Sequence, residues 1–237
     1  MNTSKAIILA AGRGTRIKKL CSNKPKCLLK NPLDQNSILI RQINILKKHK
    51  INDIVIISGY KSHLIKKEVS KFKGVKVKYY PKYKLTNNLN TLLYFKKEII
   101  SNFVCLFSDV IFDEKILSNL LKKKKDVVAV VDTKKVLKNT MRVKINRSHL
   151  TGIGSHITVK SGDGNFIGIC KFSKKAGLKL KKNLIKLKNR YKDYYTIAIQ
   201  KMINDKSIVN FIDCKKLFWR EIDTIQDYKQ LLKKYEK

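Results

Sequence analysis

The fold is decided by residues 5–29, which run K-A-I-I-L-A-A-G-R-G-T-R-I-K-K-L-C-S-N-K-P-K-C-L-L. The unbroken apolar segment 6–11 predicts a strand that is buried on both faces, as in a parallel sheet. This strand passes without a break into a glycine-rich turn that carries Arg13 and Arg16. We therefore expect a buried strand that leads directly into a ligand site.

The chemistry of this turn favours phosphate. Gly12 and Gly14 allow positive φ and a close approach of the backbone, so that N–H groups can face phosphate oxygens. Arg16 and Lys26 bring positive charge to the same place, and a triphosphate fits this arrangement. The turn is not a Walker A loop, because the four-residue spacer and the G-K-[ST] ending are absent, and it lacks the third glycine of a G-x-G-x-x-G fingerprint.

Length and composition indicate one intracellular α/β domain. A chain of 237 residues with only 3 Pro and 10 Gly has no linker composition, so we expect a single domain over 1–237, with a nucleotide-binding half at 1–132 and acceptor-binding strands and closing helices at 133–237. No signal-peptide pattern or apolar run of membrane-spanning length occurs. Five Cys without C-x-x-C fit a reducing cytoplasm better than disulfides or a zinc site.

The formal net charge of +37 raises the question of nucleic-acid or membrane binding. The lysines are scattered over predicted helices, however, and no recognition module of the helix-turn-helix, zinc-finger or RNP type is present. We therefore expect no specific nucleic-acid partner and no membrane partner, and a monomer or a homodimer. A non-catalytic protein that binds polyanions remains an alternative.

Alternating strand and helix patterns predict a doubly wound, mostly parallel Rossmann-like sheet. From residue 141 the pattern changes to period two with glycine-containing turns, which predicts a small antiparallel excursion laid against the parallel sheet, where an acceptor pocket would be built. The expected strands are 6–11, 54–57, 75–80, 103–107, 127–131, 141–145, 150–154, 165–172 and 208–212, with a segment at 217–222; the expected helices are 38–50, 64–72, one that includes residues 92–99, 115–124, 180–191, 195–204 and one from residue 224.

Ligands of open α/β sheets bind beyond the carboxyl ends of the strands. The glycine-rich turn at 12–16, the turn at 58–60 and Asp109 each follow a predicted strand. These three separate stretches should therefore converge at one edge of the sheet.

Two aspartates are candidates for a metal site. Asp109 follows an apolar strand, and Asp113 is the better cap for the next helix, which leaves Asp109 free. Thr224 and Asp227 form the acidic variant of a capping box, which leaves Asp223 surplus to the cap. Mg²⁺ favours one or two carboxylates together with phosphate oxygens and water, so Asp109 and Asp223 would suffice.

Several motifs are similar to one enzyme family. L-A-A-G-R-G-T-R followed by P-K-C-L resembles the signature of nucleotidylyltransferases that activate sugar 1-phosphates and phosphocholine. Further segments resemble the short phosphocholine cytidylyltransferases and their phosphonate-activating relatives, and they cover nearly the whole chain in order. These segments are T-N-N-L-N-T-L at 86–92, M-R-V-K-I followed by L-T-G-I-G, G-N-F-I-G-I-C-K-F-S at 164–173 and W-R-E-I-D-T at 219–224.

The resemblance implies that a phosphate or phosphonate oxygen of an acceptor attacks the α-phosphorus of CTP and releases pyrophosphate. Mg²⁺ would be held by Asp109 and Asp223, although some relatives place D-x-D where this chain has S-D-V. Lys26 and Arg16 would bind the triphosphate, and with Asp109 they are the expected catalytic residues. A sugar-1-phosphate nucleotidylyltransferase that uses another NTP is the alternative enzyme.

The expected binding residues fall into two sets. Residues 59–60 and 87–88 are candidates for contacts to the pyrimidine base of the nucleotide. Roles in a turn and at a helix N-cap explain the same residues equally well. Aromatic side chains could cage a quaternary ammonium through cation–π contacts, although such residues are more often core. The nucleotide set is Leu9, Ala10, Ala11, Gly12, Arg13, Gly14, Thr15, Arg16, Lys26, Gly59, Tyr60 and Asn88; the acceptor set is Tyr194, Tyr195, Trp219 and Glu221.

Overall fold

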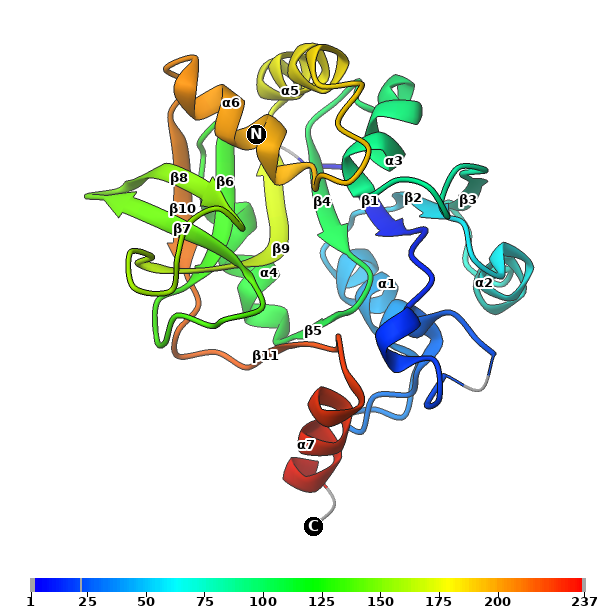
Figure 1. Ribbon diagram of the computed structural model, residues 1–237. Helices are drawn as coiled ribbons and strands as arrows, with labels where there is room; N and C mark the ends of the chain where they lie inside the picture. Colours follow the sequence, from blue (N-terminus) through cyan, green and yellow to red (C-terminus); the bar gives the residue numbers. More distant parts are fainter. Residues whose placement is uncertain (1–2, 22, 236–237) are drawn as a thin grey trace.

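The central strand of the fold is β1 (Lys5–Ala10), all six residues of which are buried. In the computed structural model, which describes residues 3–21 and 23–235, β1 pairs in parallel with β2 (Asp53–Ser58) on one side and with β4 (Phe103–Phe107) on the other. The apolar run predicted a strand buried on both faces, and its two parallel neighbours and covering helices confirm that prediction (Figure 1).

A nine-stranded sheet has the order β3-β2-β1-β4-β9-β6-β10-β8-β7. Strands β3, β2, β1 and β4 are parallel, and so are β6 and β10, which confirms the α/β, mostly parallel, doubly wound class. The remaining bounds are β3 Val75–Tyr79, β6 Val127–Asp132, β7 Met141–Asn146, β8 His149–Gly154, β9 Gly164–Phe172 and β10 Val209–Asp213.

Strand β9 corrects the expectation that the antiparallel strands lie against the parallel sheet. It runs inside the sheet, antiparallel to both β4 and β6, and all nine of its residues are buried. Its first residues also pair with β7, so that β9, β6, β10, β8 and β7 close a ring of pairings. The exchange of partners occurs near Gly168, whose φ of 83° and missing Cβ accommodate the Phe107 ring.

Two groups of helices flank the sheet (Figure 1). In one group α3, α5 and α6 contact one another, and in the other α1 contacts α4, while α2 packs beside β3. The bounds are α1 Ile38–Lys48, α2 Ser62–Val69, α3 Asn88–Tyr94, α4 Glu114–Lys122, α5 Lys174–Lys186, α6 Thr196–Asn204 and α7 Ile225–Tyr235.

The helices whose bounds differ most from those predicted are α3 and α5. Helix α3 ends at Tyr94, so Ile99 lies outside it, beyond a short 3-10 helix at Lys96–Glu98. Helix α5 begins at Lys174 because the hydroxyl of Ser173 accepts a hydrogen bond from the Ala176 amide and so caps the helix, which ends at Lys186. Apolar periodicity alone did not reveal this cap.

Two predicted helix caps are confirmed, and a strand pairing lies beside them. Asp113 accepts a hydrogen bond from the Lys115 amide at the start of α4. Thr224 and Asp227 bond reciprocally at the start of α7. Just before α7, β11 (Trp219–Glu221) pairs antiparallel with β5 (Val110–Phe112), with residue 221 opposite residue 110. This pairing brings residues 221–223 close to residue 109.

All five cysteines are buried and free, as expected for a chain without a disulfide framework. Over residues 3–21 and 23–235, no helix combines the length and apolar character required to cross a membrane.

Candidate active site

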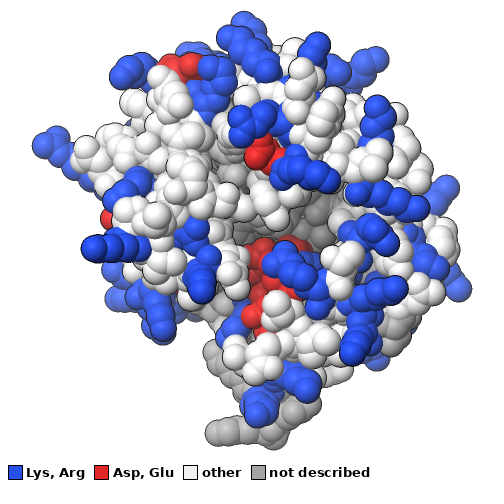
Figure 2. Space-filling model, in the orientation of Figure 1, with Lys and Arg blue, Asp and Glu red and all other residues white. Residues whose placement is uncertain are grey.

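A cavity of about 210 Å³ opens where β1 and β4 end. Figure 2 shows acidic side chains gathered in a hollow of this face, with Lys and Arg side chains around it. The lining residues come from the glycine-rich turn, from the 3-10 helix at 26–28, from the start of α3 and from the segment after β4. They are Leu9, Ala10, Ala11, Gly12, Gly14, Thr15, Arg16, Pro25, Lys26, Cys27, Tyr83, Thr86, Asn87, Asn88, Thr91, Phe107, Ser108, Asp109, Tyr194, Glu221 and Asp223.

The glycine-rich turn is shaped by two different requirements. Gly14 has φ 59°, and a Cβ at this position would lie 3.2 Å from the Cβ of Lys26, so the turn and the lysine segment are packed closely. Gly12 would place a Cβ in open space, with no atom within 4 Å. Gly14 is therefore needed for the backbone conformation, whereas Gly12 leaves the cavity unobstructed for a ligand.

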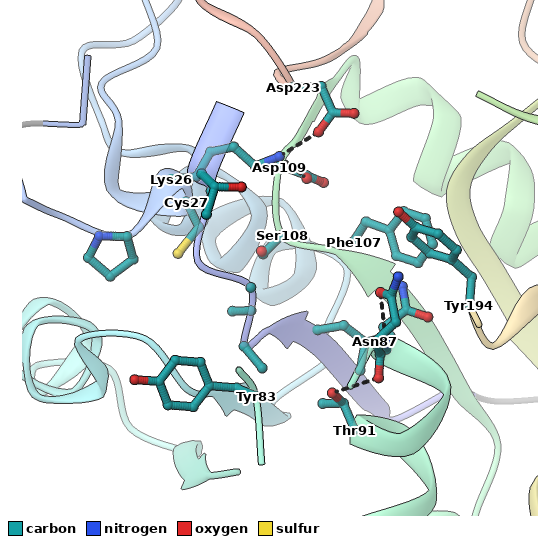
Figure 3. A pocket seen from close by; sticks show the side chains of 18 of the residues that line it. Lys26, Cys27, Tyr83, Asn87, Thr91, Phe107, Ser108, Asp109, Tyr194 and Asp223 are labelled. Atoms are coloured by element: carbon teal, nitrogen blue, oxygen red, sulfur yellow. Dashed lines mark hydrogen bonds and ion pairs between the residues drawn. The ribbon is translucent and has the colours of Figure 1, made fainter. Parts of the chain in front are cut away.

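Lys26 lies at the centre of the site (Figure 3). Its Nζ is 2.6 Å from Oδ2 of Asp109 and 2.8 Å from Oδ1 of Asp223, and Arg16 lies 3.1 Å from the other oxygen of Asp223. Burial opposes the charged form of Lys26, but the two carboxylates outweigh burial and hold its pKa above the ordinary lysine value. The residue is therefore a fixed cation at neutral pH.

Three carboxylates form a cluster around this lysine. Asp109, Glu221 and Asp223 each offer an oxygen, and these oxygens lie within 4.8 Å of one another. Burial and the charges of Asp109 and Asp223 raise the pKa of Glu221. Oδ1 of Asp109 is buried and has no hydrogen-bond partner among the described residues. An unpaired carboxylate oxygen in a three-carboxylate cluster fits the donor set that Mg²⁺ prefers.

Glu221 was expected to contact the acceptor, and the structure places it in the carboxylate cluster. A usable signal was present in the sequence, because residues 221 and 223 are two apart and side chains at this spacing share one face of an extended chain. The capping argument drew attention to Asp223 alone. Glu221 also lines the two neighbouring cavities, so it lies where the three cavities meet.

Gln42 supports the segment that carries Asp109. This α1 side chain is 1% exposed, and its amide donates to the carbonyls of Phe107, at 2.9 Å, and Val110, at 2.8 Å. These two carbonyls bracket residues 108–109. Nothing in the local sequence of α1 indicated the role, because a single glutamine on an apolar helix face has no motif around it.

Tyr83 and the start of α3 form the far wall of the cavity of about 210 Å³ (Figure 3). A Cβ on Gly59 would lie 2.6 Å from both Tyr83 and the Ala11 carbonyl, so this glycine allows the tyrosine to pack there. The Oδ1 of Asn88 accepts a hydrogen bond from the Tyr195 amide at 2.7 Å, which fixes the Asn88 amide group at the cavity wall.

Three residues of the expected nucleotide set, Gly59, Tyr60 and Arg13, lie outside the lining of this cavity. Gly59 supports the wall from behind. Tyr60 donates its backbone N–H to the Ala11 carbonyl and its hydroxyl to Asn23, away from the cavity. Arg13 is exposed and outside the lining set. The turn at 58–60 does reach the glycine-rich turn, but as packing rather than as a direct ligand contact.

The three aromatic residues expected to bind the acceptor lie in three different surroundings. Tyr195 is fully buried, with its ring edge-to-face against Phe107 and Phe166, so its assignment to acceptor binding is wrong. Tyr194, the preceding residue, lines the cavity beside the glycine-rich turn. Trp219 lines a second cavity of about 420 Å³ and donates its indole N–H to Asp132 at 2.8 Å.

The second cavity lies beside the first across the charged cluster. Both are lined by Arg16, Glu221 and Asp223. The described residues therefore provide two adjoining cavities that share the side chains of Glu221 and Asp223, which is an arrangement suited to two substrates that react with each other.

Fold and site together define an α/β protein with a cavity lined by charged side chains at the carboxyl ends of its parallel strands. Residues 5–141, more than half of the chain, match the sequence profile of the nucleotidyl transferase family. The chain belongs to this family.

Two relatives and one solved structure show which members of the family this chain is similar to. Choline-phosphate cytidylyltransferase of Streptococcus pneumoniae is 39% identical over 100 residues, which are 42% of this chain and 42% of that enzyme's length. CTP:phosphoglutamine cytidylyltransferase of Campylobacter jejuni is 24% identical over 185 residues, 71% of this chain and 72% of that one. The solved structure of CTP:phosphocholine cytidylyltransferase from S. pneumoniae has a TM-score of 0.81 at 26% identity, over 97% of both chains.

Proposed function

We propose that the protein is a Mg²⁺-dependent cytidylyltransferase that transfers CMP from CTP to a small phosphorylated or phosphonate acceptor and releases pyrophosphate. The observation that carries this proposal is the position of Lys26 between Asp109 and Asp223, beside the glycine-rich turn. Relatives named as cytidylyltransferases for choline phosphate and for phosphoglutamine support the choice of CTP and of a phosphorylated acceptor.

The residues of the chain account for the reaction by positioning and charge. A phosphate acceptor is already anionic at neutral pH, so its oxygen can attack the α-phosphorus without a general base. Lys26, held cationic, stabilises negative charge on the α-phosphoryl group, and Arg16 binds the β- and γ-phosphates. Backbone N–H groups around Gly12 orient the phosphate chain.

Asp109, Glu221 and Asp223 would hold the metal. Bound there, Mg²⁺ would neutralise phosphate charge and polarise the phosphoryl oxygens. Lys26 pairs with Asp109 and Asp223, and Arg16 pairs with Asp223, so both cationic groups lie beside the carboxylates that would hold the metal.

The second cavity is where the acceptor would bind. Trp219 presents an aromatic ring there, and Asp132 lies against its indole N–H, which together suit an acceptor with a positively charged amine or ammonium group. Phosphocholine-like compounds and aminoalkylphosphonates meet this description. A sugar 1-phosphate with another NTP is the competing outcome.

Pyrophosphate release tests the proposal. The purified protein with Mg²⁺ is assayed with each of the four NTPs against phosphocholine, 2-aminoethylphosphonate, phosphorylated amino acids and sugar 1-phosphates. We expect release with CTP and one phosphorylated acceptor, and its loss when EDTA removes the metal. Lys26→Ala should lower kcat about 10²–10³-fold. Lys24→Ala, an exposed lysine two residues away, is the matched control and should retain activity.

Two results would overturn this assignment. Undiminished pyrophosphate release in Lys26→Ala would remove the lysine from the mechanism. Silence with every NTP and acceptor, in protein that binds RNA more tightly than CTP at about 200 mM salt, would favour the non-catalytic polyanion-binding alternative, because ordinary counterion release weakens non-specific binding steeply over this salt range.

A further inference from the structure

The loop between β6 and β7, residues 133–140, contacts the acceptor side of the site alone. Four of its residues, 137–140, line the cavity that contains Trp219, and two of them, Asn139 and Thr140, also line a smaller cavity of about 170 Å³ beside Tyr194. Both cavities are lined by Glu221 and Asp223 of the carboxylate cluster, and no residue of this loop lines the cavity beside the glycine-rich turn. The loop contains no helix or strand, so backbone pairing within the loop does not hold its shape.

One buried side chain holds this loop from beneath. Asn165, near the start of β9, is fully buried and makes four hydrogen bonds. Its Oδ1 accepts from the Leu137 amide at 2.8 Å and from the Thr140 hydroxyl at 2.9 Å. Its Nδ2 donates to the carbonyls of Lys135, at 2.7 Å, and Asp132, at 3.3 Å. Every donor and acceptor site of the amide is thereby used, and all of the partners lie within 132–140.

A second buried side chain, on the neighbouring strand β7, forms hydrogen bonds with the same loop. Arg142 is 8% exposed and lies opposite Asn165 in the β7–β9 register. Its guanidinium donates to the carbonyls of Leu137, at 3.2 Å, and Lys138, at 2.6 Å, and on its other side to those of Ser155 and Ile157. All four partners are backbone carbonyls. The charge of this arginine therefore serves loop structure.

We propose that the loop 133–140 selects the acceptor and that Asn165, assisted by Arg142, is the positioning residue that holds it in the binding conformation; this rests on the proposed function. Ordering a loop without regular structure costs conformational entropy at every residue, so the acceptor itself would have to order an unanchored loop. The buried amide performs that ordering before binding, which lowers the cost of binding the acceptor.

The test compares two isosteric substitutions. Asn165→Asp keeps both accepted hydrogen bonds but turns a carboxylate oxygen toward the carbonyls of Lys135 and Asp132. Asn183→Asp is the matched control, because Asn183 is also a buried asparagine bonded to a backbone carbonyl, on α5, and lines neither substrate cavity. For each variant the acceptor KM, the CTP affinity by calorimetry and amide hydrogen exchange are measured.

In Asn165→Asp we expect the acceptor KM to rise tenfold or more, CTP affinity to stay within twofold of wild type, and exchange to accelerate in 133–140 but not in 12–16. Asn183→Asp should change none of these three values. Equal losses of CTP and acceptor affinity, or unchanged exchange in 133–140, would overturn the proposal.

Two further variants keep both parts of the proposal falsifiable. If Asn165→Asp does not fold, Arg142→Lys retains the charge but loses the planar fork, and it should give the same split between acceptor and CTP. Asn139→Ala should alter the ratio of kcat/KM for two acceptors, and an unchanged ratio contradicts selection by the loop. If wild-type protein releases no pyrophosphate with any acceptor, the proposed function fails, while the exchange measurement still decides whether Asn165 orders the loop.

Discussion

Replacing Gln42 with Met tests how the aspartate after β4 is held in place. Methionine retains the length and much of the volume of glutamine but removes the amide that bonds the carbonyls of Phe107 and Val110. Both carbonyls lose a partner in a region where Gln42 is 1% exposed, and an unpaired buried group costs about 1–3 kcal/mol. The Oε1 of Gln42 is itself buried without a partner among the described residues, so its removal offsets part of this cost.

The net expectation is a loss of about 2 kcal/mol in the free energy of unfolding, which for a chain of this size lowers Tm by about 4–8 °C. Because the two carbonyls flank Asp109, metal affinity should also fall about 10–100-fold, as for other residues that orient a metal ligand. Denaturant unfolding measures the first effect, and Mn²⁺ binding followed by calorimetry measures the second. Gln226→Met, at an exposed position on α7, is the control. Unchanged metal affinity in a destabilised variant would refute the positioning role, and unchanged stability would refute the hydrogen-bond argument.

Three further predictions follow from individual contacts. Asp223→Asn should lower kcat/KM at least 100-fold and weaken Mn²⁺ binding, because it removes charge from the cluster and from the partner of Lys26; wild-type kinetics would contradict it. Gly14→Ala should destabilise the protein by about 1–2 kcal/mol and weaken CTP binding, measured by unfolding and calorimetry, since φ is 59° and the added Cβ meets Lys26. Glu98→Gln should cost about 1–2 kcal/mol at pH 7, because the carboxylate pairs with buried Lys5 at 2.7 Å. Burial raises the pKa of Glu98, but its lysine partners lower it by more, so this stabilisation is present above the ordinary carboxyl pKa and is lost as pH falls through the lowered value; an equal cost at pH 3 would refute it.

Much of the fold was predictable because its signals are local. The apolar segment 6–11 indicated a doubly buried strand, and Asp113 and the Thr224–Asp227 pair marked helix starts through side-chain hydrogen bonds within one turn. The position of β9 was not predictable in this way, because hydrophobic periodicity indicates burial without naming the neighbouring strand. In the structure this strand lies between β4 and β6, within the sheet.

The residues of the candidate site were also predictable only in part. Lys26, Arg16, Asp109 and Asp223 were named from the sequence, and the structure brings all four together. Tyr195 was assigned to the acceptor and is core, because the sequence does not show which of two adjacent tyrosines faces inward.

The sequence by itself determined the glycine-rich turn, the parallel half of the sheet and the residue types that carry charge to its edge, since each depends on neighbours within a few positions. Only the tertiary structure decided that β11 pairs with β5 and so joins Glu221 to the two aspartates, and that Asn165 lies beneath the loop 133–140. Such contacts join residues far apart in the chain, and their partners are selected by packing and hydrogen-bond satisfaction in the whole fold, which no local pattern records.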